Sequence, residues 1–172
     1  VREQYATADN MTDTLAALQV ANGYLLPCRA ALLADFEGKW AHDGLVLDNW
    51  LRLVGSKPAA DVLDEVKQAM SHPTFSIRNP NRLRALIGSF AMNNQVQFHA
   101  VDGSGYRFLT DLLIALNEVN PQVASRLITP LIQFKRLDEG RKTLIRAELI
   151  RLANLEGLAR DLFEKVSKAL AQ

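Results

Sequence analysis

The residue types that most often bind metal ions are present but unfavourably spaced. The three histidines, His42, His72 and His99, lie far apart, and none has a second His or Cys at a ligand spacing. The helical metal-binding motif H-E-x-x-H does not occur. We therefore interpret the histidines as surface or cap residues, and we expect no metal site within this chain.

His99, Asp102 and Ser104 lie close together and have the residue types of a catalytic triad. Triad members normally come from separate segments, and the serine lies on a strained turn after a strand. Here Ser104 lies in a Gly-Ser-Gly loop without a preceding strand pattern, so we predict a helix-entry loop with Asp102 or Ser104 near the cap. Cys28 has no local His partner, and we expect a small buried residue rather than a nucleophile.

Two long stretches of the chain contain basic residues but no acidic residue. Residues 66–101 include Arg82 and Arg84, which a helical wheel places on opposite sides of an apolar stripe, and residues 119–137 include Arg126. Gln122 and Arg126 are four residues apart, so they project from one face of a helix.

A Gln and an Arg side by side can receive a peptide carbonyl or carboxylate, the arginine in bidentate fashion. The alternative is that these arginines are solvated and paired to acids on neighbouring helices. Spacing alone does not separate the two interpretations.

The sequence pattern predicts that all segments that position these side chains are helices. Leu83, Leu86, Ile87 and Phe90 recur with helical period, and no segment alternates as a strand does. We expect helices over about 106–119, 139–153 and 158–171. We also expect Pro58 in the first turn of a helix and a kink or break at Pro130.

A weak internal repeat links the two basic stretches. Asn79-Pro80 and Asn120-Pro121 each predict a helix start with an Asn cap, and each is followed by a Leu-Ile pair at the same distance. A period of about 40 residues made of helix pairs is typical of HEAT and armadillo arrays. The predicted fold is all-α, an irregular superhelical stack of antiparallel helix pairs in a single domain spanning 1–172, in which equivalent faces line one concave surface.

Composition and charge exclude several functional classes. The 172 residues carry a net charge of +1, which gives little attraction for nucleic acid or for anionic membranes. No apolar run approaches the roughly 18 residues of a membrane span, and no signal peptide opens the chain. With a single cysteine, which fits a reducing compartment, these features predict a cytoplasmic protein.

Longer segments resemble the C-terminal region of bacterial aminopeptidase N, a family of broad-specificity alanyl aminopeptidases among the gluzincin zinc peptidases. The segments that carry this resemblance are Asn10–Asp13, Thr74–Arg82, Phe98–Tyr106, Asn120–Ile128 and Leu162–Leu170. They span nearly the whole chain.

The resemblance implies a helical bowl that closes over a catalytic domain of the same polypeptide, controls access of peptides and contacts them beyond the scissile bond. It implies zinc in the parent enzyme but neither cofactor nor catalytic residue here, because the zinc motif and the Gly-x-Met-Glu-Asn motif belong to earlier domains. Ala91-Met92-Asn93-Asn94 is not a copy of the latter, since it lacks the glutamate. The chain alone should therefore be inactive as a peptidase, and its start at Val1 fits an excised fragment.

The resemblance also implies roles for particular residues. Gln122 and Arg126 match family residues that project into the enclosed cavity and contact the substrate, and Arg84 matches a second arginine of that cavity. Two other interpretations remain open: a free-standing helical-repeat module that binds a partner protein or peptide, and a purely structural lid.

Overall fold

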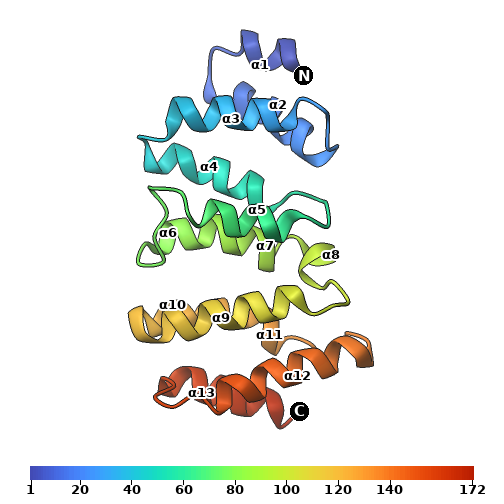
Figure 1. Ribbon diagram of the computed structural model, residues 1–172, viewed down its shortest axis with the longest axis vertical. Helices are drawn as coiled ribbons and strands as arrows, with labels where there is room; N and C mark the ends of the chain where they lie inside the picture. Colours follow the sequence, from blue (N-terminus) through green and yellow to red (C-terminus); the bar gives the residue numbers. More distant parts are fainter. The chain divides into compact units, whose positions relative to one another are not determined.

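All regular elements of the chain are helices. The computed structural model describes residues 1–172 and contains no strand, which confirms the predicted all-α class (Figure 1). The chain divides into two compact units, Val1–Gln97 and Phe98–Gln172. The prediction of a single domain over 1–172 stays a prediction.

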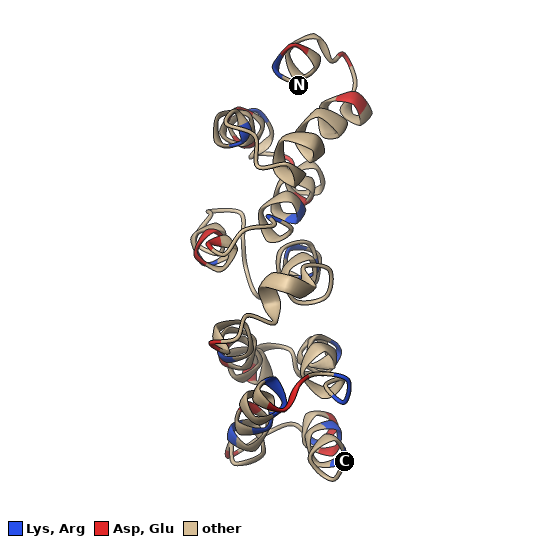
Figure 2. Cartoon of the chain, turned by 90° about the vertical axis from the view of Figure 1, so that its right-hand side faces the viewer, with Lys and Arg blue, Asp and Glu red and all other residues tan.

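The first unit arranges its helices in two layers, seen nearly end-on in Figure 2. One layer holds α3 (Arg29–Trp40) and α5 (Val62–Ala69). The other layer holds α2 (Met11–Gly23), α4 (Gly44–Gly55) and a composite helix of α6 (Pro80–Leu83), the π-helix η1 (Arg84–Gly88) and α7 (Ser89–Ala91). Helix α1 (Arg2–Thr7) packs on α2, and the short α8 (Gln95–Phe98) follows α7 in the sequence.

Apolar side chains from both layers form the core of the first unit. Leu18, Leu33, Phe36 and Leu53 are buried in one cluster, against which partly buried aromatic and aliphatic residues pack. Val62 and Val66 of α5 are also buried, as their helical spacing predicts. Burial of this apolar surface is the main favourable contribution to the stability of the unit.

The second unit is also built from two layers. It contains α9 (Ser104–Val119) and α12 (Glu139–Ala153) on one side and α10 (Pro121–Leu127) and α13 (Arg160–Leu170) on the other, with the short α11 (Thr129–Ile132) against α10 and α13. Its core includes Tyr106, Leu113, Leu149 and Val166, none of which is exposed.

The predicted caps and breaks at prolines are confirmed with one exception. Asn79 and Asn120 cap α6 and α10 with their side-chain oxygens, and the missing N–H of Pro130 coincides with the break between α10 and α11. The prediction for Pro58 is wrong. It lies in a turn before α5, which begins only at Val62. The N–H of Ala59 donates a hydrogen bond to the carbonyl of Lys57, which closes a tight turn around Pro58, and the helix begins only after this turn.

Replacing two glycines of the first unit by alanine should change the free energy of unfolding in opposite directions. A Cβ on Gly55 would lie 2.5 Å from the carbonyl oxygen of Leu86, whereas a Cβ on Gly38, at an exposed position of α3, would meet nothing within 4 Å. Gly55→Ala should therefore lower the free energy of unfolding by about 1–3 kcal/mol through overpacking. Gly38→Ala should raise it by about 0.5–1 kcal/mol. Urea unfolding of the chain tests both, and a neutral Gly55→Ala would contradict the close approach.

Candidate functional site

Helix α10 presents the two residues predicted to contact a peptide. The side chain of Asn120 accepts a hydrogen bond from the N–H of Val123 at 3.2 Å, and Pro121 occupies the first turn. These two features fix where the helix begins, and therefore which residues face inward. Ala124 and Leu127 are buried where α10 packs against α9 and α13.

Gln122 and Arg126 lie on the opposite, exposed face of α10, one turn apart. Neither side chain makes a hydrogen bond or an ion pair. The backbone carbonyl of Arg126 is occupied, because it accepts a hydrogen bond from the hydroxyl of Thr129 at 2.9 Å. The structure therefore brings an amide and a guanidinium together with all of their donors available. It does not contain the ion pairs that the alternative interpretation of Arg126 required.

Arg84 lies in the first unit, as the first residue of η1. It is exposed and has no ion-pair partner either. Arg82, two residues earlier, is buried and paired to Asp48 at 2.5 Å. The two arginines that the helical wheel placed on opposite sides of the stripe thus differ completely in environment. The pairing of Arg82 was missed from the sequence, because Asp48 is 34 residues away.

The His99 loop does not have the geometry of a triad. The hydroxyl of Ser104 donates directly to Asp102 at 2.7 Å, as does its N–H at 2.9 Å. Both residues lie next to Gly103, the N-cap of α9, so they are near the cap as the sequence predicted. Nδ1 of His99 lies 2.7 Å from the hydroxyl of buried Tyr106. Burial first, and then the charge of Arg141, lower the pKa of His99, while burial raises the pKa of Tyr106 to about 12. Both side chains are therefore neutral near pH 7, which is compatible with a structural role in the packing of the second unit.

Two other sequence candidates have structural roles. Cys28 is buried, as predicted. Asn94, the last residue of the segment Ala91–Asn94, is buried and donates to the carbonyls of Gly55 and Lys57 at 3.2 and 2.8 Å. It ties the end of α4 to the residue pair before α8. No group of three or more His, Cys, Asp or Glu residues in the structure could hold a metal ion.

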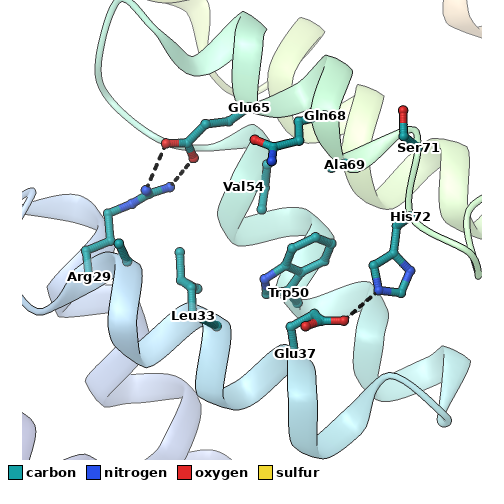
Figure 3. A pocket seen from close by; sticks show the side chains of 12 residues that line it. Arg29, Leu33, Glu37, Trp50, Val54, Glu65, Gln68, Ala69, Ser71 and His72 are labelled. Carbon is teal, nitrogen blue, oxygen red and sulfur yellow. Dashed lines mark hydrogen bonds and ion pairs between the residues drawn. The ribbon is translucent and has the colours of Figure 1, made fainter.

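The first unit also contains a hollow of about 530 Å³, lined by α3, α4, α5 and the segment after α5 (Figure 3). Its ionisable side chains already contact one another. Arg29 contacts Glu65 at 2.8 Å, and His72 contacts Glu37 at 2.7 Å. Burial alone would raise the pKa of Glu65, but hydrogen bonds from Arg29 and Lys57 lower it, so the carboxylate stays ionised. The hollow thus differs from α10, because its ionisable side chains already have hydrogen-bond partners within the chain.

Comparison with known proteins identifies the domain type. The family described as "Domain of unknown function (DUF3458_C) ARM repeats" matches residues 1–171. The chain belongs to this ARM-repeat family. The ARM-repeat description agrees with the predicted stack of helix pairs.

Individual relatives of this ARM-repeat domain are bacterial aminopeptidases. The chain is 58% identical over 170 residues to aminopeptidase N of Haemophilus influenzae and 52% identical over 171 residues to aminopeptidase N of Escherichia coli. In both comparisons 99% of the chain and 20% of the relative are covered. The chain thus spans about a fifth of the length of these relatives. The resemblance to the helical domain of bacterial aminopeptidase N is confirmed.

A solved structure has the same fold. Legionella pneumophila aminopeptidase A, crystallised in complex with aspartic acid, matches with a TM-score of 0.91 and 29% identity over 99% of this chain and 20% of that one. The structure of the present ARM-repeat domain contains no helix with the length and hydrophobicity needed to cross a membrane.

Proposed function

We propose that this chain is the C-terminal domain of a broad-specificity zinc aminopeptidase that removes N-terminal residues from peptides in the cytoplasm. The observation that carries the proposal is the 52–58% identity, over 99% of the chain, to aminopeptidase N of two bacteria. Zinc and the reacting groups would belong to a catalytic domain elsewhere in the same polypeptide, because this chain has no group of residues that could hold a metal.

The contribution of this chain to the reaction is enclosure and orientation. A helical domain that caps the active-site cavity would admit peptides and exclude folded proteins and bulk water. Gln122 and Arg126, whose side chains have no partner within the chain, would hold the backbone of the substrate beyond the scissile bond. Arg84, also exposed and unpaired, would supply a further contact of the same kind.

Activity of the full-length polypeptide tests this proposal. It should release N-terminal residues from short peptides, and a zinc chelator should abolish the release. Residues 1–172 alone should release none, with or without added zinc. A full-length polypeptide without peptidase activity that binds a partner protein or peptide would contradict the proposal and favour the free-standing interaction module.

A further inference from the structure

Arg84 begins a local irregularity of the backbone. The five residues of η1 form a π-helix between two short α-helical segments, α6 and α7. Such π-helical insertions are rare and occur frequently at functional sites. Arg84 is exposed at the start of this insertion, whereas Ala85, Leu86 and Ile87 are buried. The irregular segment therefore has one outward-facing charged residue.

The α-helical turn before η1 is anchored by a buried ion pair. Nη1 of Arg82 lies 2.5 Å from Oδ1 of Asp48 on α4, and the side chains are 10% and 6% exposed. The Arg82 guanidinium also lies directly against Gly44, where any Cβ would overlap it. The position of the guanidinium is thus restricted both by charge and by shape.

The π-helix itself is held by the other end of α4. A Cβ on Gly55 would lie 2.5 Å from the carbonyl oxygen of Leu86 and 3.2 Å from the backbone nitrogen of Phe90. Only a glycine lets the two backbones approach this closely. Gly44 and Gly55 are the first and last residues of α4, so one helix locates both the turn before η1 and η1 itself.

Helix geometry couples the inner anchor to the outer arginine. Successive residues of an α-helix are rotated by about 100°, so side chains two positions apart point in nearly opposite directions. The N–H of Arg84 bonds back to the carbonyls of Asn81 and Pro80, which places Arg82 and Arg84 in one continuous turn. Holding Arg82 against Asp48 therefore holds Arg84 outward.

We propose that Asp48 and Arg82 are positioning residues whose buried ion pair fixes the direction in which Arg84 meets the peptide substrate. The proposal rests on the proposed function, in which Arg84 contacts the peptide beyond the scissile bond. The ion pair itself does not touch the substrate and acts only through Arg84.

A double-mutant cycle in the full-length polypeptide separates this role from general stabilisation. We expect Arg84→Ala to raise KM for a tetrapeptide about tenfold, the loss of one charged contact, without changing kcat. Asp48→Asn should raise the KM for the tetrapeptide by a comparable factor and leave the KM for a single-residue chromogenic amide unchanged. In the Arg84→Ala background, Asp48→Asn should cause no further increase. If Asp48→Asn does not fold, Arg82→Lys, which keeps the charge but not the geometry, takes its place in the cycle.

Glu65→Gln provides the control, because it weakens the partly buried ion pairs of Glu65 with Arg29 and Lys57 in the first unit, which involve no residue of α6 or η1. It should leave KM for the tetrapeptide unchanged. Two results would overturn the proposal, because each would show that the Asp48–Arg82 pair is merely structural. One is an increase in KM for Glu65→Gln equal to that for Asp48→Asn. The other is an increase in KM for Asp48→Asn that is the same whether residue 84 is arginine or alanine. If Arg84→Ala has no effect but Arg126→Ala does, the positioning role is overturned while the proposed function stands. If neither has an effect, the substrate contact itself fails.

Discussion

Arg126→Ala in the full-length polypeptide should lower kcat/KM for a tetrapeptide by about 5- to 150-fold. That range corresponds to the 1–3 kcal/mol by which a charged hydrogen bond in a desolvated site contributes to binding. A single-residue chromogenic amide lacks the downstream backbone, so its kcat/KM should change much less. Steady-state kinetics with both substrates measures the difference. Arg126→Lys should recover only part of the loss, since lysine keeps the charge but not the bidentate geometry.

Arg136→Ala is the matched control for this prediction. Arg136 is also exposed and without an ion-pair partner, and it lies in the same acid-free stretch but outside α10. Its replacement should leave kcat/KM unchanged for both the tetrapeptide and the amide. Equal losses with the tetrapeptide and the amide for Arg126→Ala would remove the proposed contact with the peptide backbone, and equal losses for Arg126→Ala and Arg136→Ala would indicate a general effect of net charge.

Asp48→Ala should lower the free energy of unfolding of the chain by about 3–5 kcal/mol. The substitution leaves the guanidinium of Arg82 buried without its counter-ion, and breaking one side of a buried pair costs that much because the remaining charge has lost both water and partner. Urea denaturation followed by circular dichroism measures the change. An exposed pair gives the scale for comparison: removing Glu164, which pairs with Arg160 on the surface of α13, should cost less than about 1 kcal/mol.

Replacing both members of the buried pair should restore much of this loss. Asp48→Leu combined with Arg82→Met removes the unpaired charge and fills similar volume with apolar atoms, an exchange that is often neutral or stabilising. A double variant as unstable as Asp48→Ala would contradict this explanation and would indicate that packing around Gly44, rather than the buried charge, dominates the effect.

Features that depend on neighbouring residues could be predicted from the sequence. The caps at Asn79 and Asn120 and the break at Pro130 are set by side chains within one turn of the backbone that they affect. The position of Pro58 was predicted wrongly because a proline suits a turn as well as a first helical turn, and no local pattern distinguishes the two.

Features that depend on residues far apart in the chain could not be predicted from the sequence. The spacing of Leu83, Leu86 and Ile87 is compatible with an ordinary α-helix, and the π-helix lies against Gly55, which is far away in the sequence. The i,i+4 spacing predicted the shared face of Gln122 and Arg126, and the structure adds that neither has a partner.

Gln122 and Arg126 should bind the backbone of the substrate, and a crystal structure of the full-length polypeptide with a non-hydrolysable peptide would show whether they do. We expect the guanidinium of Arg126 and the amide of Gln122 each to lie about 2.7–3.2 Å from an oxygen of the peptide beyond the scissile position. A bound peptide whose oxygens are all held by other residues, with both side chains of α10 facing bulk solvent, would contradict this expectation.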